Sequence, residues 1–206
     1  MTKGPSLKRT LNALSVCALV AVPLFGLQSA TAAVPSHERI RVLESARPIG
    51  EARLTDQNGH AVALSSIRGS VTFVLFGYTN CPDACPAGME RLRELHDSGA
   101  IPREVKVKYV LISVDGERDT PAALKTFLAK YSSNFVGLTA SPNTVKPIAA
   151  NFSASFFAGA HDHADHYTVA HSPQIFIVDP AGNIRAEVYG ASLDAMADVA
   201  RALSAE

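Results

Sequence analysis

A continuous apolar run, Val71–Phe76, leads directly into a loop with two cysteines and then into a helical pattern. An apolar run of this length without polar alternation is typical of a strand that is covered on both faces of a sheet. The helical pattern extends from Pro86 to about Ser98, and Gly99 provides a C-terminal stop. Its apolar positions are Met89, Leu92 and Leu95. The order of strand, loop and helix restricts the chain to folds in which a helix packs against a sheet.

The rest of the chain has alternating strand and helix patterns. The predicted elements are a hairpin of 52–56 and 61–64, a strand at 71–76, a helix at 86–98, a strand at 105–114, a helix at 121–131, a third helix, a hairpin of 174–178 and 184–189, and a helix at 193–203. The third helix begins near Ser141 or Thr144. Pro147 favours the later start, because proline costs about 3 kcal/mol in a helix interior and little in its first turn. The alternation predicts an α/β sandwich.

The first 33 residues have the order of an export signal. Three basic residues precede an apolar run from about Leu11 to Leu27, and Ala30–Ala32 is a small-x-small cleavage site. We therefore expect a signal peptide over residues 1–33, with an uncleaved membrane anchor as the alternative, since about 20 apolar residues span a bilayer. This predicts export to the periplasm, where the protein is either free or anchored to the inner membrane.

The remaining residues are enough for one domain with its own core. We expect a polar lead-in over residues 34–50 and a single folded domain over 51–206. The formal charge is zero, with 19 basic and 19 acidic residues. No cluster of Lys and Arg resembles the basic stripe of a nucleic-acid binder. We therefore do not expect nucleic acid as a partner.

Cys81 and Cys85 are the two thiols expected in the mature chain, since Cys17 lies in the predicted signal. In an oxidising compartment, a cysteine pair is a structural disulfide, a redox pair or a metal site, and the residues alone leave all three open. Cysteines four residues apart can project to the same side of a loop that enters a helix. Because unpaired amides and the helix dipole favour thiolate at a helix start, we expect both sulfurs to be predisposed to ionise.

Four segments resemble signatures of the SCO/SenC family within the thioredoxin superfamily. They are Gly77–Pro86 (GYTNCPDACP), Ile112–Pro121 (ISVDGERDTP), Gly137–Thr139 (GLT) and Tyr167–Ser172 (YTVAHS). The superfamily also has a proline ahead of a late strand, as at Pro173. The resemblance extends from about Leu54 to Gly190. It implies a thioredoxin-like fold for residues 51–206, with a central mixed sheet flanked by helices and an added amino-terminal hairpin.

The resemblance implies that Cys81, Cys85 and His171 together bind one copper ion. Copper(I) prefers thiolate and accepts imidazole, while binding of copper(II) stays an open question. His171 is far from the cysteines in the chain, so the fold has to bring it to them. The family usually has aspartate where this chain has Ala170, so any orienting role of that carboxylate is missing here.

The function implied by the resemblance is that of an exported copper-binding protein, a metallochaperone that delivers copper to, or matures, the copper centre of a respiratory cytochrome c oxidase. The expected partner is the copper-bearing oxidase subunit, with a second periplasmic copper chaperone and a thiol reductant as further candidates. One alternative is a thiol-disulfide oxidoreductase that acts on the cysteines of the oxidase subunit. The three residues between Cys81 and Cys85, and the absence of tryptophan, depart from the usual thioredoxin motif. A peroxidase of the peroxiredoxin type is a second alternative, although Tyr78 stands where that pattern has threonine.

Two further polar segments flank these motifs. His161, His163 and His166 alternate with aspartates just ahead of His171, and such a tract is either a solvated loop or a weak site that captures copper. The charged residues of Asp115–Asp119 predict a loop and a helix cap without a ligand role, and Thr120 is the expected N-cap of the helix that follows.

Overall fold

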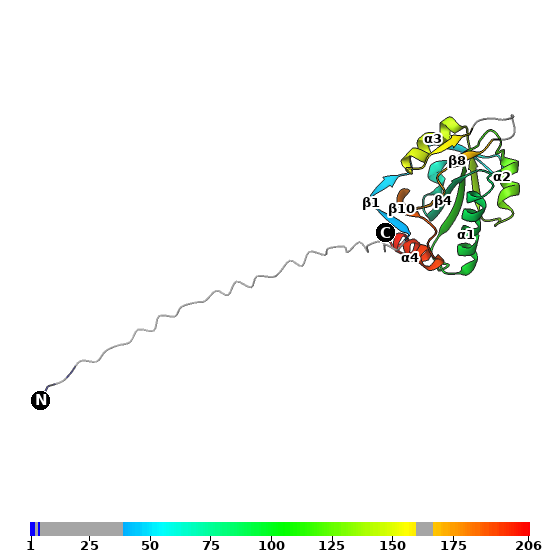
Figure 1. Ribbon diagram of the computed structural model, residues 1–206. Coiled ribbons are helices and arrows are strands. Elements are labelled where there is room, and N and C mark those ends of the chain that lie inside the picture. The colour runs from blue at the N-terminus through cyan, green and yellow to red at the C-terminus, as the bar shows by residue number, and fades with distance from the viewer. Residues whose placement is uncertain (3, 5–38, 160–166) are drawn as a thin grey trace. The chain divides into compact units, whose positions relative to one another are not determined.

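The computed structural model describes residues 1, 2, 4, 39–159 and 167–206 (Figure 1). Nearly all of the predicted signal peptide, including Cys17, and the cluster of His161, His163 and His166 lie outside the described residues. Among the residues that are described, no helix has both the length and the apolar character needed to cross a bilayer.

The centre of the fold is an eight-stranded mixed sheet. Its strands are β1 (Ile40–Pro48), β2 (Arg53–Asp56), β3 (Ala61–Ala63), β4 (Val71–Gly77), β5 (Val107–Ser113), β6 (Val136–Thr139), β9 (Ile175–Val178) and β10 (Asn183–Val188). They lie in the order β1-β10-β9-β4-β5-β6-β2-β3. Strands β4, β5 and β6 are parallel, and the other pairs are antiparallel. The predicted central strand is confirmed, since all seven residues of β4 are buried.

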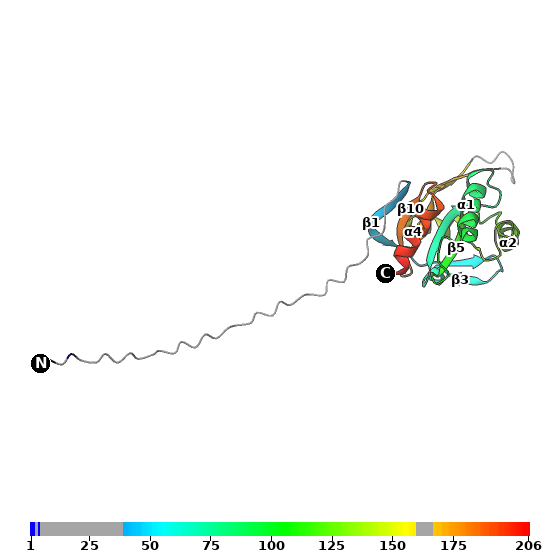
Figure 2. The same cartoon turned by 90° about the horizontal axis from the view of Figure 1, so that it is seen from below.

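Helices and a small ribbon cover the two faces of this sheet. The helices are α1 (Ala84–Ser98), α2 (Pro121–Leu128), α3 (Pro142–Asn151) and α4 (Leu193–Ser204), with a short 3₁₀ turn, η1 (Leu64–Ile67). Alternate side chains of β4 point to opposite faces: Phe73 and Leu75 pack against α1, α2 and α4, whereas Val74 and Phe76 pack against α3 and η1. Helices α1 and α4 lie side by side (Figure 2). Strands β7 (Phe156–Ala158) and β8 (Val169–His171) form a separate antiparallel ribbon on the α3 side.

Most predicted elements are present, with local differences at their ends. The hairpin of β2 and β3 is confirmed, and its turn contains Gly59 at φ 84°. Helix α1 begins two residues before the predicted Pro86, and Gly99 ends it at φ 68°. Helix α2 begins after the predicted cap Thr120 but ends at Leu128, before the predicted end at 131. Strand β1 lies within residues 34–50, for which no strand was predicted, and it pairs with β10.

Of the two starts considered for the third helix, the one near Ser141 is confirmed and the preferred one near Thr144 is wrong, because α3 begins at Pro142 and contains Pro147. Ser141 caps the helix, since its hydroxyl accepts a hydrogen bond from the amide of Thr144 at 3.3 Å. Pro142 occupies the first helical position, where proline fits. Burial of one face of the helix, with Val145 and Ile148 inaccessible to solvent, outweighs the hydrogen bond that Pro147 removes.

Candidate metal centre

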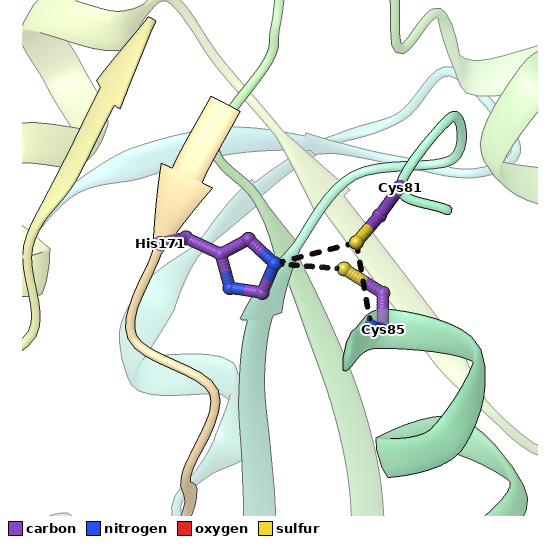
Figure 3. A group of neighbouring side chains, drawn as sticks. All are labelled: Cys81, Cys85 and His171. Carbon is purple, nitrogen blue, oxygen red and sulfur yellow. Dashed lines mark hydrogen bonds between the residues drawn. The ribbon is translucent and has the colours of Figure 1, made fainter. Parts of the chain in front are cut away.

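Three potential metal ligands from separate parts of the fold converge beyond the carboxyl end of β4. Cys81 lies on the loop after β4, Cys85 in the first turn of α1, and His171 at the end of β8. Nε2 of His171 lies 3.1 Å from Sγ of Cys85 and 3.6 Å from Sγ of Cys81. One donor atom from each residue lies within 4.8 Å of the other two. The imidazole points toward both sulfurs (Figure 3). The structure thus brings together the three residues that the sequence analysis selected.

Each of the two sulfurs accepts a hydrogen bond from a backbone amide, and a glycine leaves room for the sulfur of Cys85. The amide of Tyr78 donates to Sγ of Cys85 at 3.4 Å, and the amide of Cys85 donates to Sγ of Cys81 at 3.5 Å. A Cβ atom at Gly77, the last residue of β4, would lie 2.6 Å from Sγ of Cys85. Gly77 therefore leaves the space that the sulfur occupies.

Burial sets the protonation of the Cys85 thiol in the metal-free protein. Cys85 is fully buried, whereas Cys81 and His171 are half-buried. Burial raises the pKa of Cys85, its hydrogen bond with Cys81 raises it further, and the amide of Tyr78 acts in the opposite direction. The expectation that the helix start predisposes both sulfurs to ionise is wrong for Cys85, because desolvation of a thiolate outweighs the nearby amides and the dipole of α1.

The histidine presents its neutral form to the sulfurs. Nδ1 of His171 lies 3.1 Å from the backbone carbonyl oxygen of Ser172. Because a carbonyl only accepts, Nδ1 carries the proton and the lone pair of Nε2 faces the cysteines. Burial lowers the pKa of His171 and the Ser172 carbonyl opposes it, and the net lowering favours the metal-binding neutral imidazole. This chain has Ala170, which is exposed, in place of the expected aspartate. The Ser172 carbonyl provides an orienting contact for the imidazole of His171 instead.

The charged loop between β5 and α2 braces the cysteine loop. The carboxylate of Asp119 is buried and accepts hydrogen bonds from the amide and the hydroxyl of Thr79, at 3.1 and 2.6 Å, and from the hydroxyl of Ser113 at 2.7 Å. The predicted helix cap is present at Thr120, which accepts from the amide of Ala123. The brace on Thr79 was not predicted, because the two residues are 40 positions apart and no local pattern joins them.

The same loop also contacts the segment that leads to His171. The hydroxyl of Tyr167 donates to Asp115 at 2.6 Å. Arg118 pairs with Asp115 and lies 3.7 Å above the centre of the Tyr167 ring. A cation over an aromatic face is attracted by the ring quadrupole. The loop therefore supports both sides of the metal centre: the cysteine loop through Asp119 and the approach to β8 through Tyr167.

Known proteins are similar to this chain in sequence and in fold. Residues 43–204 match the SCO1/SenC family. The mitochondrial SCO2 homolog of Bos taurus is 30% identical over 189 residues, which are 87% of this chain and 69% of that protein. Copper-bound ScoI of Bradyrhizobium japonicum is 33% identical with a TM-score of 0.66, and the match covers 75% of this chain and 98% of that one.

A third relative is known for a redox property. BsSco, a member of the Sco family of cytochrome c oxidase assembly proteins in which a disulfide switch was identified, is 24% identical with a TM-score of 0.63, covering 80% of this chain and 98% of that one. At that identity the likeness concerns the fold alone. With the ScoI match, the predicted thioredoxin-like fold is confirmed.

Proposed function

The chain belongs to the SCO1/SenC family, and from that premise we propose that Cys81, Cys85 and His171 bind one copper(I) ion for delivery to the copper centre of a respiratory cytochrome c oxidase. The observation that carries the proposal is the convergence of two thiols and one neutral imidazole within 4.8 Å. The copper-bound state of the ScoI relative supports the choice of metal.

The donor set suits copper(I) better than the other common metals. Copper(I) is soft, prefers thiolate and accepts imidazole, whereas magnesium and calcium require oxygen ligands. Structural zinc sites have four protein ligands, whereas this group has three members among the described residues; three-ligand zinc sites with two cysteines and one histidine also exist, so the copper-bound ScoI relative is what favours copper over zinc. In zinc sites, sulfur and nitrogen ligands lie about 2.0–2.3 Å from the metal, so a sulfur and a nitrogen bound to the same ion stand roughly 3–4 Å apart. The sulfur-to-nitrogen distances of 3.1 and 3.6 Å therefore need little rearrangement.

The exposure of the ligands favours transfer over storage. A three-ligand site leaves a coordination position open, so that an acceptor can bind the ion before the donor releases it. Cys81 and His171 are half-buried, whereas Cys85 is fully buried. An incoming thiolate or imidazole therefore approaches on the side of Cys81 and His171, and Cys85 is the last ligand to release the ion.

The acceptor and the compartment follow from the family and from the amino terminus. This chain belongs to the SCO1/SenC family, and BsSco is described as a member of the Sco family of cytochrome c oxidase assembly proteins; shared family membership therefore supports the copper-bearing oxidase subunit as acceptor. The export signal expected in residues 1–33 supports a periplasmic location.

Copper(I) titration followed by transfer tests this function. The reduced protein should hold one equivalent of copper(I) in competition with a chelator. When mixed with the metal-free copper domain of the oxidase subunit, it should load that domain with copper, measured by metal analysis after the two proteins are separated, faster than an equal concentration of chelated copper(I). Transfer no faster than from the chelator would contradict a delivery role, and absence of tight binding would contradict the metal site.

A second candidate function is thiol-disulfide exchange with the oxidase subunit, favoured by the closeness of the two sulfurs. In that reaction Cys81 and Cys85 form a disulfide and lose two electrons and two protons, which reduce a disulfide of the partner to two thiols. Two measurements separate the functions. A redox enzyme alone holds no tight copper(I) in the titration, and a chaperone alone leaves the disulfide of an oxidised partner unchanged.

A further inference from the structure

Tyr78 contacts both halves of the metal centre. Its backbone amide donates to Sγ of Cys85 at 3.4 Å. Its ring lies edge-on to the imidazole of His171, with centroids 5.9 Å apart and planes at 89°. Its hydroxyl accepts a hydrogen bond from the backbone amide of Val169 at 3.1 Å. One residue of the cysteine loop thereby reaches the strand that carries the histidine, 91 positions further along the chain.

The bond to Val169 matters because it restrains β8 on the side opposite β7, whereas the bonds between Gly159 and Thr168 and between Ser172 and Ser155 restrain it on the β7 side. The strand has three residues and pairs on one side with β7, which is equally short. Val169 and Tyr78 are both buried, so water cannot replace the hydroxyl as a partner for the amide. A buried amide that loses its acceptor is costly, and the backbone moves to find another. Since His171 is two residues after Val169 and on the same face of β8, that movement displaces the imidazole.

We propose that Tyr78 is a positioning residue of the metal centre, whose hydroxyl holds β8 so that His171 stays within reach of the ion bound by Cys85 and Cys81. This inference rests on the copper site proposed above and adds to it a residue that touches no metal. Tyr78 stands at the position where the peroxiredoxin pattern has threonine. In this protein the residue at that position joins the cysteine loop to β8.

The test combines Tyr78→Phe with His171→Ala in a double-mutant cycle. Tyr78→Phe keeps the ring and the amide and removes only the hydroxyl. Copper(I) affinity, measured by chelator competition, should fall about tenfold in the otherwise unchanged protein, the size expected for one lost hydrogen bond. In the His171→Ala background the same change should have no further effect on affinity, because the residue acts through the imidazole.

The matched control is Tyr109→Phe, which removes the hydroxyl of another buried tyrosine, in β5, whose ring stacks on Phe73 away from the metal centre. It should leave copper(I) affinity unchanged in both backgrounds. An equal loss from Tyr78→Phe with and without His171 would overturn the proposal, because it would show a general effect on folding. No loss in the presence of His171 would overturn it as well.

A metal-free measurement keeps this test separate from the proposed function. In the copper-free protein, NMR should detect proximity between the Hε1 proton of His171 and the β protons of Cys85, and slow exchange of the Val169 amide. Tyr78→Phe should weaken the proximity signal between His171 and Cys85 and accelerate exchange of the Val169 amide, whereas Tyr109→Phe should change neither. If the parent protein fails to bind copper(I), the proposed function fails, while the two NMR readouts still decide the role of Tyr78. Unchanged NMR readouts in Tyr78→Phe would refute the positioning role of Tyr78.

Discussion

Nε2 of His171 lies 3.1 Å from Sγ of Cys85, although 86 positions separate the two residues in the chain. The contact joins a three-residue strand on one side of the sheet to the first turn of α1 (Figure 3). The closeness of an imidazole lone pair to a buried sulfur distinguishes this centre from a simple dithiol.

Replacing His171 with alanine should lower copper(I) affinity by at least about 100-fold, because even groups that only orient a metal ligand are worth roughly 10- to 100-fold. Circular dichroism and thermal unfolding should show that the fold persists. His60→Ala is the control, since His60 is an exposed histidine in the hairpin turn, and it should bind copper(I) like the parent. Equal affinities of His171→Ala and the parent would remove His171 from the site.

Gly77→Ala should lower both stability and copper(I) affinity. The new Cβ atom would lie 2.6 Å from Sγ of Cys85 and 3.2 Å from a methyl group of Leu111, so the sulfur has to move. Overpacking of this kind costs about 1–3 kcal/mol, measurable by denaturant unfolding.

Gly88→Ala is the matched control for Gly77→Ala. Its Cβ atom would lie 2.9 Å from a terminal methyl group of Leu75, and its three nearest atoms all belong to that side chain, so the close contact does not involve the sulfur of Cys85. It should therefore retain copper(I) affinity. If both variants retain it, the close approach at Gly77 has no bearing on the metal centre.

Thr79→Val should destabilise the protein in a pH-dependent manner. The change removes the hydroxyl that donates to the buried carboxylate of Asp119, a bond to a charged group worth about 1.5–3 kcal/mol. Burial raises the pKa of Asp119 above 3.8, while the hydrogen bonds of Thr79 and Ser113 oppose that rise. Without the hydroxyl the pKa of Asp119 should rise further.

The sign of this pH dependence follows from linkage. A carboxyl whose pKa is higher in the folded than in the unfolded state favours folding below the unfolded value and loses that advantage as the pH rises through the folded pKa. The difference in free energy of unfolding between the parent and Thr79→Val should therefore be full at neutral pH and shrink as the pH falls through the raised pKa of Asp119. Thr126→Val, at an exposed position of α2, should show no such trend. A difference that is constant with pH would mean that Asp119 is not the acceptor that matters.

Pro147→Ala should stabilise the protein by about 2 kcal/mol. Alanine restores the amide that can donate to the carbonyl of Asn143 and gains about 3 kcal/mol of helix propensity, offset by about 1 kcal/mol of added unfolded-state entropy. Pro147 is exposed, so no packing is lost. Pro142→Ala, at the first helical position, should bring no comparable gain. Thermal unfolding compares the variants, and a lower midpoint for Pro147→Ala than for the parent would contradict this account of α3.

Local patterns in the sequence were sufficient for the elements with strong periodicity. The buried run of β4, the apolar positions of α1, the hairpin of β2 and β3 and the cap at Thr120 each depend on neighbours within a few residues, and each is present. The preference for the later start of α3 was wrong, because packing of its buried face outweighs the local cost of Pro147.

Short elements gave no pattern to interpret. Strands β7 and β8 have three residues each, too few for a period of two to be distinguished from chance. His171 was selected through a family resemblance and not from the strand that carries it.

By itself, the sequence determined that two thiols lie at a strand-to-helix junction, because their spacing and surroundings are local. Only the tertiary structure decided that His171 faces them with Nε2, that burial raises the pKa of Cys85, and that Tyr78 and Asp119 hold the two sides of the site. The physical reason is that burial and long-range hydrogen bonds depend on which segments pack together. Those partners lie 40 to 91 positions apart, beyond the reach of any local pattern.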